Sequence, residues 1–472
     1  MPTCVIDGRE VEFVPGQNLI EVAKKVGIEI PYYCYHPGLS VVAQCRMCSV
    51  EIENVPKLQP ACATLPKSGM VVKTRSPRAV QNQKAVSEYL LINHPLDCPI
   101  CDKSGECDLQ DYSFEYGDPH TRMTEERRTY VDLDMGPVIV KNMNRCIHCT
   151  RCIRFGTEVA GIHEMVATQR GNWTEISTID GRPLETDYAG NYADICPTGS
   201  LLLKDFRFKR RVWFLKKTPT TCEACARGCN MEIHQDGNVI YRCVPRENLE
   251  VNKYWLCDEG RFNFHYIHDT DRVVSPMVRV NGKLEIANWA RAIETARETM
   301  NAKKPAILVG SDLTQQEALL LRDEFLPGKF PGAPFFHFGT PEIISGADDG
   351  PADKILKRKS RTANLHGLEK LGYSGFEKLP AGTDAVLIIR GGRAVLPELK
   401  LSKIVGIGVF KRNEVENFAA VLPGVTFAEK DGTVVNFQGR EQTFRRAIAP
   451  PDGCKGLPEI LMTWINHKGS VR

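Results

Sequence analysis

Cysteine is the residue that most constrains how this chain can fold. The 472 residues include 18 cysteines, of which 17 lie before residue 258 and only Cys454 lies after it. Many of the 17 stand in pairs or triplets with two or three residues between neighbours. In a reducing compartment, cysteines spaced in this way ligate metals more often than they form disulfides. The sequence therefore predicts a metal-rich N-terminal part followed by a cysteine-poor C-terminal part.

Composition and charge narrow the class of protein. Apolar residues make up 42% of the chain and charged residues 25%, which is ordinary for a globular protein and excludes disorder. The net charge of +3 gives no reason to expect a nucleic-acid partner. The length predicts about three domains. No apolar run approaches the ~18 residues of a membrane span, and the first residues lack a signal-peptide pattern, so we expect a cytoplasmic location.

The first cysteine group is spaced C-x10-C-x2-C-x13-C. Four thiolates from a loop and a later segment suit a [2Fe–2S] cluster, and the plant-type ferredoxin pattern is similar but has a shorter first gap. The alternative is a structural zinc site, which usually uses two close pairs rather than one pair and two single cysteines. The predicted ligands of the [2Fe–2S] cluster are Cys34, Cys45, Cys48 and Cys62.

The second group mixes one histidine with three cysteines in the spacing H-x3-C-x2-C-x5-C. This ligand set also suits zinc, and the type of ligand alone does not decide between the metals. If it holds an iron–sulfur cluster, imidazole in place of a thiolate leaves the cluster less negative and raises its potential. The candidate ligands of this first [4Fe–4S] cluster are His94, Cys98, Cys101 and Cys107.

The third group has the strongest iron–sulfur pattern. A C-x2-C-x2-C run followed by a remote Cys-Pro is the ligation pattern of bacterial ferredoxins. It predicts a second [4Fe–4S] cluster held by Cys146, Cys149, Cys152 and Cys196. Three arginines beside the run are able to offset the negative charge of a cluster or to form solvated surface, and the sequence leaves both readings open. They are Arg145, Arg151 and Arg154.

The fourth group is spaced C-x2-C-x3-C-x27-C and also suits a [4Fe–4S] cluster. Its predicted ligands, for the third such cluster, are Cys222, Cys225, Cys229 and Cys257. Three cysteines remain outside the four groups, and we expect them to be isolated buried thiols. They are Cys4, Cys243 and Cys454.

Local patterns predict the beginning of a β-grasp domain at the N-terminus. Strands over 4–6 and 11–13 flank an Asp-Gly turn, and Asn18 with Glu21 forms a capping-box pattern at the start of a helix that Gly27 ends. Further expected elements are strands at 49–52 and 70–73 and a helix over 79–93. The segment 97–215 has few periodic stretches, so metal is expected to replace part of its apolar core.

Beyond residue 271 the pattern changes to alternating strands and helices, which predicts an α/β layer. The expected elements are strands at 306–310, 385–389 and 403–410 and a helix over 314–325. The segment 341–380 is rich in Gly, Lys and Arg and is expected to be a surface insertion. The Gly406-Ile-Gly408 fragment lacks the third glycine of a dinucleotide-binding loop and is expected to lie in the core.

The order of the four groups resembles that of the large iron–sulfur subunit of respiratory complex I, the family of the bacterial NADH-quinone oxidoreductase G subunit and the mitochondrial 75 kDa subunit. The resemblance covers the first 270 residues. It is carried by the strings Ile30-Pro-Tyr-Tyr-Cys34-Tyr-His-Pro37, Cys45-Arg-Met-Cys48, Asn93-His94-Pro-Leu-Asp-Cys98-Pro-Ile-Cys101 and Asn144-Arg-Cys146-Ile-His-Cys149-Thr-Arg-Cys152.

The resemblance implies an α+β multidomain fold. Its expected parts are a β-grasp [2Fe–2S] ferredoxin-like domain at 1–78, a [4Fe–4S] domain with one histidine and three cysteine ligands at 79–120, a [4Fe–4S] ferredoxin-like domain at 121–215, a [4Fe–4S] domain of molybdopterin-oxidoreductase type at 216–272 and an α/β molybdopterin-oxidoreductase-like domain at 273–472. The last part carries a family-like segment at 417–441. It is expected to be shortened and to hold no molybdopterin.

The resemblance also implies a function. The chain would carry one [2Fe–2S] and three [4Fe–4S] clusters and no flavin, and would pass single electrons from a flavin- and NADH-binding subunit toward a quinone-reducing module. It would act as an enzyme only as a subunit of the NADH:quinone oxidoreductase, with no substrate chemistry of its own. It would lie at the cytoplasmic side of the cell membrane within a membrane-bound complex. The fourth cluster resembles one found in only some bacterial members and thought to lie off the main path.

Other classes of protein share parts of these patterns. The nearest alternative is the electron-transfer subunit of a soluble NAD-linked hydrogenase or formate dehydrogenase, but such subunits usually end soon after the third group. An iron-only hydrogenase needs a further downstream cysteine cluster, and a molybdenum enzyme needs a metal ligand and a much larger domain. A zinc-stapled scaffold explains the ligand counts but not the ferredoxin-like third group.

One more segment suggests a partner. Residues 204–217 combine basic side chains with Phe206, Phe208, Trp213 and Phe214. Aromatic residues and arginine are enriched in interfaces, so the segment is a candidate docking face. The alternative is a helix with one solvated basic side and one side in the core.

Overall fold

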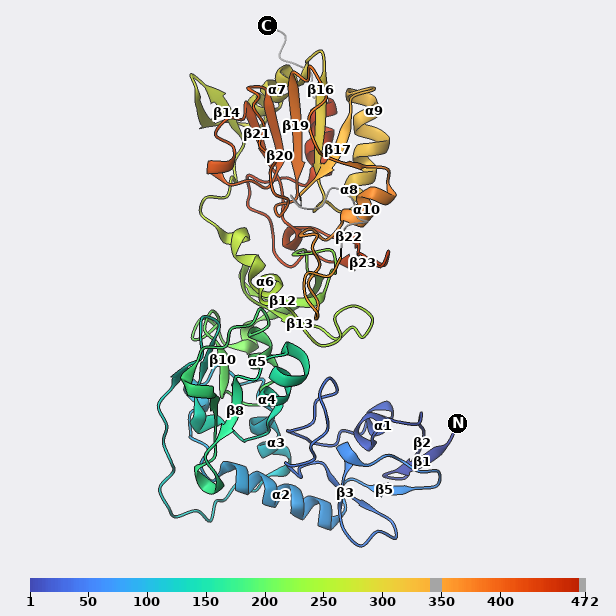
Figure 1. Ribbon diagram of the computed structural model, residues 1–472, viewed down its shortest axis with the longest axis vertical. Helices are drawn as coiled ribbons and strands as arrows, with labels where there is room; N and C mark the ends of the chain where they lie inside the picture. The colour runs from blue at the N-terminus through green and yellow to red at the C-terminus, as the bar shows by residue number, and fades with distance from the viewer. Residues whose placement is uncertain (340–349, 467–472) are drawn as a thin grey trace. The chain divides into compact units, whose positions relative to one another are not determined.

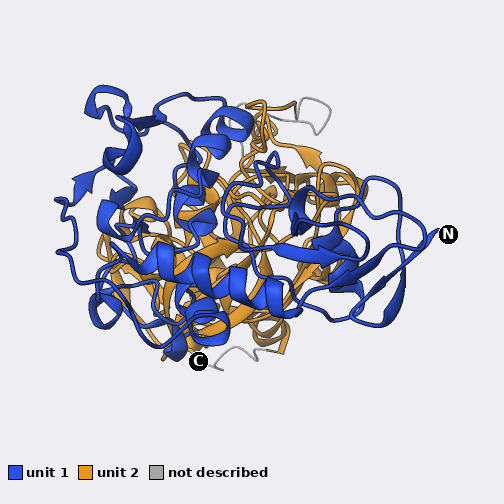
Figure 2. Ribbon diagram, turned by 90° about the horizontal axis from the view of Figure 1, so that it is seen from below, with its two compact units in different colours: residues 1–215 blue, residues 216–472 orange. Residues whose placement is uncertain are grey.

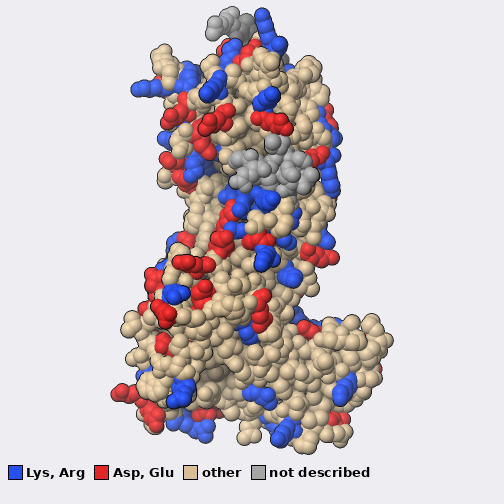
Figure 3. Space-filling model, in the orientation of Figure 1, with Lys and Arg blue, Asp and Glu red and all other residues tan. Residues whose placement is uncertain are grey.

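The computed structural model describes residues 1–339 and 350–466. The chain has a mixed α and β fold and forms two compact units, residues 1–215 and 216–472 (Figure 2). Basic and acidic side chains are interspersed on the face drawn in Figure 3. Their total numbers are nearly equal, with 61 lysines and arginines against 58 aspartates and glutamates. Within the described residues, none of the helices combines the length and apolar character that crossing a bilayer requires.

The first unit begins with a five-stranded sheet in the order β2-β1-β5-β3-β4 (Figure 1). Its strands are β1 (Thr3–Ile6), β2 (Arg9–Glu12), β3 (Ser49–Ile52), β4 (Gln59–Pro60) and β5 (Val71–Lys73), and α1 (Leu19–Lys25) packs against it. The predicted capping box is present, because Asn18 Oδ1 accepts from the Glu21 amide and the Glu21 carboxylate accepts from the Asn18 amide. The antiparallel β1–β2 hairpin and the parallel β1–β5 pair are the arrangement that a β-grasp domain requires.

The rest of the first unit has short elements joined by long loops. The predicted helix over 79–93 is observed as α2 (Pro77–Leu91), which the Ser76 side chain caps. The other elements are α3 (Asp108–Tyr116), α4 (Arg151–Phe155), α5 (Gly190–Ile195), a sheet of β6 (Leu133–Asp134), β7 (Ile139–Lys141) and β10 (Leu201–Leu203), and a hairpin of β8 (Met165–Thr168) and β9 (Glu175–Thr178).

The second unit opens with a small antiparallel sheet and then forms the predicted α/β layer. The small sheet holds β11 (Lys216–Thr221), β12 (Asn230–Asp236) and β13 (Val239–Pro245), and α6 (Asp258–Phe262) follows. The eight-stranded sheet runs β15-β14-β21-β20-β19-β16-β17-β18. Its strands are β14 (Met277–Val280), β15 (Lys283–Ile286), β16 (Pro305–Gly310), β17 (Phe335–Phe338), β18 (Ser374–Gly375), β19 (Ala385–Arg390), β20 (Ile404–Gly408) and β21 (Ala420–Pro423).

The central strands of this sheet are buried on both faces, as their apolar runs predict. One face packs against helices and holds Ile307, Leu387 and Ile407, and the other holds Leu308 and Ile388. The remaining elements are α7 (Trp289–Met300), α8 (Gln315–Leu320), α9 (Leu326–Lys329), α10 (Leu365–Lys370), α11 (Leu457–Asn466) and the hairpin β22 (Gly432–Val435) with β23 (Glu441–Phe444). The Gly406-Ile-Gly408 fragment is fully buried in β20, which confirms its place in the core.

One expectation and one of the alternative readings from the sequence are wrong. The segment 341–380 is not a surface insertion over its described part, because residues 350–380 contain α10 and β18 and bury Ser360, Thr362 and Tyr373. Residues 341–349 lie outside the described residues. The segment 204–217 is not a helix either: its described elements are a turn, a single 3-10 turn and the start of β11.

Candidate metal centres

The structure brings the four thiols of the first group together. Cys34 and Cys45 lie on the loop after α1, Cys48 directly precedes β3, and Cys62 lies in the turn after β4. The Cys34 thiol contacts those of Cys45 and Cys62, and the Cys48 thiol contacts that of Cys62. These hydrogen bonds lower the pKa of Cys34 and of Cys48, whose thiolates are the ligating form, and raise the pKa of the two thiols that donate to them, Cys45 and Cys62.

The backbone of the first loop is shaped around Cys34. Ala43 and Arg46 have φ angles of 53° and 60°, in the left-handed region that non-glycine residues seldom adopt. The amides of Gln44 and Cys45, which lie between them, point at the Cys34 thiol. Successive amides turned toward one point form an anion-binding concavity. The loop is thus built to hold negative charge at its sulfur atoms.

The second group lies along one loop that joins α2 to α3. Cys98 is exposed, whereas Cys101 and Cys107 are buried, and the thiols interact in the pairs Cys98–Cys101 and Cys101–Cys107. His94 is linked to them through Arg145, whose charge acts on both the imidazole and the Cys101 thiol.

The His94 side chain suits a metal ligand. Burial first, and then the charge of Arg145, lower the pKa of its imidazole to about 4. The ring is therefore neutral at pH 7, which is the state that ligates metals. Its Nδ1 atom is buried and has no hydrogen-bond partner.

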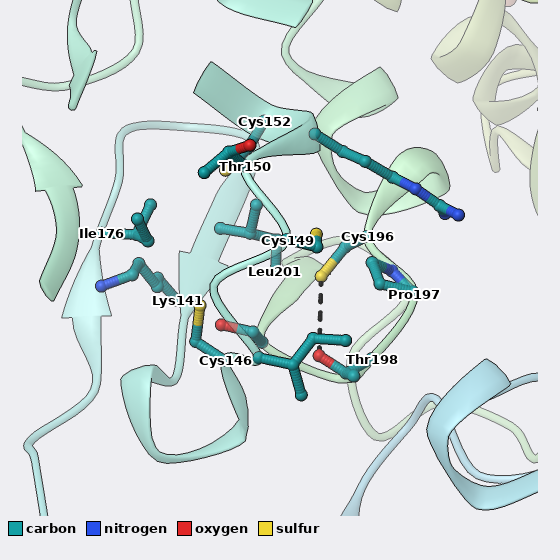
Figure 4. A pocket seen from close by; sticks show the side chains of 13 residues that line it. Lys141, Cys146, Cys149, Thr150, Cys152, Ile176, Cys196, Pro197, Thr198 and Leu201 are labelled. Carbon is teal, nitrogen blue, oxygen red and sulfur yellow. Dashed lines mark hydrogen bonds between the residues drawn. The ribbon is translucent and has the colours of Figure 1, made fainter. Parts of the chain in front are cut away.

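The third group surrounds a pocket, shown in Figure 4. Cys146, Cys149 and Cys152 come from the loop before α4 and from α4 itself, and Cys196 follows α5. The His148 amide donates to Cys146 Sγ at 3.4 Å. His148 has a left-handed φ of 52° and so turns the loop around the pocket, as Ala43 does in the first group.

The fourth group lies in the second unit, on the turn between β11 and β12 and before α6. The charges of its four thiols, Cys222, Cys225, Cys229 and Cys257, act on one another. Two amides donate to these sulfur atoms at 3.4 Å: that of Ala224 to Cys222 and that of Gly260 to Cys257.

Residues from much later in the sequence hold the loop of the fourth group. The amide of Phe437 donates to the Ala226 carbonyl at 2.9 Å, and Gln442 Nε2 donates to the Gly228 carbonyl at 2.8 Å. The segment after β22 and the strand β23 therefore fix the backbone between Cys225 and Cys229.

Two glycines leave room for cysteine sulfur atoms. A Cβ atom at Gly260 would lie 2.8 Å from Cys222 Sγ, and one at Gly199 would run into Cys101 Sγ. No spacing rule in the sequence singles out either glycine. Both show that the thiols stand in spaces that a methyl group would fill.

Burial dominates the electrostatics of the thiols in the third and fourth groups. It raises the pKa of Cys146 to about 11 and those of Cys149 and Cys257 to about 12. Ligation requires thiolates, so a bound metal must supply the positive charge that stabilises them here. Thiolates and a neutral imidazole are donors that both iron–sulfur clusters and zinc accept.

A site for a single metal ion requires several ligands that converge on one point. Over 1–339 and 350–466, no three His, Cys, Asp or Glu side chains are grouped as the ligands of one metal ion would be. A cluster does not require such convergence, because its ligands are shared among several iron atoms: one ligand binds each iron of a [4Fe–4S] cluster and two bind each iron of a [2Fe–2S] cluster.

The three arginines beside the third group are buried, so the reading as solvated surface is wrong. Arg145 is 4% exposed and pairs with Asp97 at 2.9 Å. Arg151 and Arg154 are each 6% exposed, and Arg151 donates to the Ile195 carbonyl.

Sequence reasoning missed a fourth buried cation near the third group. Lys141 is 1% exposed, lines the pocket and has no hydrogen-bond partner for its Nζ. Its position at the end of β7, five residues before Cys146, is the only signal that pointed to it. The three cysteines outside the groups are buried, as expected: Cys4, Cys243 and Cys454.

Four family models match successive parts of the chain. They are a 2Fe-2S iron-sulfur cluster binding domain over residues 2–77, the NADH-ubiquinone oxidoreductase-G iron-sulfur binding region over 83–122, the ferredoxin-like domain of NADH-quinone oxidoreductase subunit 3 over 136–202 and the molybdopterin oxidoreductase Fe4S4 domain over 215–269.

Known proteins match the same region at substantial identity. The chain is 42% identical over 320 residues to the NADH-quinone oxidoreductase G subunit of Rickettsia felis, covering 67% of this chain and 48% of that protein. It is 43% identical over 321 residues to the mitochondrial NADH-ubiquinone oxidoreductase 78 kDa subunit of Neurospora crassa, and the match covers 67% of this chain and 43% of that protein. It is 35% identical to the mitochondrial NADH dehydrogenase [ubiquinone] iron-sulfur protein 1 of Solanum tuberosum, and the match covers 91% of this chain and 63% of that protein. The chain thus spans less than two thirds of each relative.

Among solved structures, a chain of an NAD+-reducing [NiFe]-hydrogenase in the H2-reduced state is 29% identical, with a TM-score of 0.41, covering 45% of this chain and 91% of its own. Two of the family models, over 83–122 and 136–202, and the named relatives bear the names of NADH-quinone or NADH-ubiquinone oxidoreductase subunits. Over residues 2–269 the chain therefore matches the iron–sulfur region of the NADH-quinone oxidoreductase G subunit and the mitochondrial 75 kDa subunit.

Proposed function

We propose that this chain is the iron–sulfur electron-relay subunit of an NADH-quinone oxidoreductase, complex I. In this role it takes single electrons from a flavin- and NADH-binding subunit and passes them toward the quinone site. The observation that carries the proposal is the pocket of the third group. Four cysteines in the bacterial ferredoxin pattern line it, together with the buried cations Lys141 and Arg151.

The clusters supply the chemistry, which is the uptake and release of one electron at a time. Each group of ligands supports one cluster in the proposal. The [2Fe–2S] cluster is assigned to Cys34, Cys45, Cys48 and Cys62. The three [4Fe–4S] clusters are assigned to His94 with Cys98, Cys101 and Cys107, to Cys146, Cys149, Cys152 and Cys196, and to Cys222, Cys225, Cys229 and Cys257.

The same proposal covers domains, partners and location. The five domain boundaries expected from the sequence remain part of it, with an α/β molybdopterin-oxidoreductase-like domain that holds no molybdopterin after residue 272. The partners are the flavin subunit and the quinone-module subunits, and the chain lies peripherally at the cytoplasmic side of the membrane. The exposed rings of Phe208, Trp213 and Phe214 support a docking face on residues 204–217. Each ring stacks with a neighbouring arginine.

The alternative role in a soluble hydrogenase or formate dehydrogenase has less support. The named relatives at 35 to 43% identity are NADH-quinone or NADH-ubiquinone oxidoreductase subunits. The fourth group and its match to an Fe4S4 domain also continue beyond the third group, where such relay subunits usually end.

The test is the metal content of the anaerobically purified chain, with low-temperature EPR after reduction by dithionite. Four loaded clusters predict about fourteen iron atoms per chain, an equal amount of acid-labile sulfide and one binuclear signal among cubane signals. Cys149→Ser should remove one cubane signal, whereas the matched control Cys243→Ser, at a buried thiol outside the groups, should keep all of them. Zinc in place of iron would refute the relay.

A further inference from the structure

One buried arginine joins the loops of the first and third cysteine groups. Arg154 lies in α4. Its guanidinium donates to the carbonyl oxygens of Cys34 and Ser40, on the first loop, and to that of Cys149 at 3.4 Å, on the third. A single side chain thus contacts the backbone of one ligand from each group.

Other contacts show that this is a built junction between the two loops. The Glu158 carboxylate accepts from the Ser40 amide at 2.8 Å and also from its hydroxyl. Gln44 Nε2 donates to the His148 carbonyl at 2.6 Å. Residues more than one hundred positions apart in the sequence therefore hold the first and third loops against each other.

The Arg154 guanidinium forms no ion pair in the described part of the chain, and the one carboxylate whose charge acts on it, that of Glu158, is hydrogen-bonded to Ser40. All the acceptors of its guanidinium are carbonyl oxygens, its Nε atom is buried without a partner, and across the described part of the chain no carboxylate lies within ion-pair distance. Arg145, by contrast, pairs with Asp97. A buried charge that lacks a directly paired counter-charge is costly. Negatively charged clusters in the first and third groups would supply that counter-charge from both sides.

Building on the proposed function, we propose that Arg154 is a positioning residue shared by the [2Fe–2S] cluster of the first group and the [4Fe–4S] cluster of the third. It fixes the separation of the two clusters through its carbonyl contacts. Its charge stabilises the reduced, more negative state of each and so raises both reduction potentials. Both reduction potentials thus depend on the charge of Arg154. Loss of that charge lowers both of them and changes the difference between them little.

The test is an EPR-monitored redox titration of the full chain, purified anaerobically. Arg154→Gln keeps hydrogen-bond donors but removes the charge, and should lower the equilibrium constant for reduction of both clusters about tenfold, which is about 59 mV for one electron. Arg154→Lys keeps the charge. In this variant the equilibrium constant for reduction of each cluster should stay within about threefold of its value in the original chain. The matched control is Lys141→Met, since Lys141 is a buried cation at the third group alone. It should shift the cubane signal and leave the binuclear signal unchanged.

A shift of only one signal in Arg154→Gln, or of neither, would overturn the proposal. Arg154→Gln could also lose iron. Loss of the signals of the first-group [2Fe–2S] and third-group [4Fe–4S] clusters, with the His94-group signal retained, supports the shared role. Loss of the third-group signal alone contradicts it. The magnetic interaction between the two reduced clusters is a separate readout of their distance, which Arg154→Lys should weaken because an ammonium cannot span three carbonyls. An original chain that lacks iron in these two groups would refute the proposed function itself, before any variant is made.

Discussion

The space beside the fourth cysteine group allows one quantitative prediction. Gly260 lies in the first turn of α6, and a Cβ atom there would lie 2.8 Å from Cys222 Sγ and 3.5 Å from Cys257 Sγ. Relief of the closer contact, from 2.8 Å to an ordinary 3.4 Å, requires a movement of 0.6 Å. A ligand bond tolerates about 0.2 Å. Gly260→Ala should therefore displace a ligand by about three times what the metal accepts.

The expected result is loss of one cubane. The iron content of Gly260→Ala should fall from about fourteen to about ten atoms per chain, and one cubane EPR signal should disappear. Overpacking of this kind typically also costs about 1 to 3 kcal/mol of unfolding free energy. The three clusters of the first unit should be unaffected.

Gly328→Ala is the matched control for this prediction. Gly328 also lies in a helix of the second unit, α9, and a Cβ atom added there meets nothing within 4 Å. That variant should keep its full iron content and its stability. Full iron content and an unchanged set of EPR signals in Gly260→Ala would show that the space beside Cys222 does not belong to a ligand site.

Three further predictions concern other groups. His94→Cys should lower the midpoint potential of its cluster, because a thiolate adds negative charge where the imidazole was neutral; a redox titration that shows a rise contradicts the assignment. Arg272→Met should destabilise the second unit by about 3 to 5 kcal/mol in denaturant unfolding. The reason is that the Glu429 carboxylate, whose oxygens lie 2.7 and 2.8 Å from the Arg272 guanidinium nitrogens, stays buried without its partner. A smaller loss means that water reaches the carboxylate. Burial raises the pKa of Glu223 from 4.5 to about 7, so between these pH values the folded chain holds a proton that the unfolded chain releases. The free energy of unfolding should therefore fall as the pH rises from about 4.5 through about 7. Glu223→Gln should flatten this pH dependence, and a variant that keeps it would exclude Glu223 as its source.

Local signals account for most of the elements that the sequence predicted correctly. The Asn18 capping box depends on residues three positions apart, and the same holds for Thr314 and Glu317 at the start of α8. The buried strands β19 and β20 follow from short apolar runs between turn residues. The ligand groups were predictable for the same reason, since most of each group lies within one short motif.

Contacts between distant residues account for what the sequence left open or predicted wrongly. The role of Arg154 depends on Ser40 and Cys34, which lie 114 and 120 residues away. The composition of 350–380 is typical of a surface, yet the polar side chains of Thr362 and Asn364 are buried. They bond to the Ser311 side chain and the Leu313 carbonyl, and no local pattern reveals such partners.

The late segment that holds the fourth cysteine loop has a consequence for the order of assembly during translation. The ligands of the first three groups are all synthesised by residue 196, within one unit, and their loops contact one another. The Cys225–Cys229 loop gains its two late supports only when Phe437 and Gln442 have left the ribosome. Units fold in the order in which they are made. We therefore expect iron delivery to the fourth group only after residue 442 has left the ribosome, whereas the first three groups are able to receive iron earlier in translation.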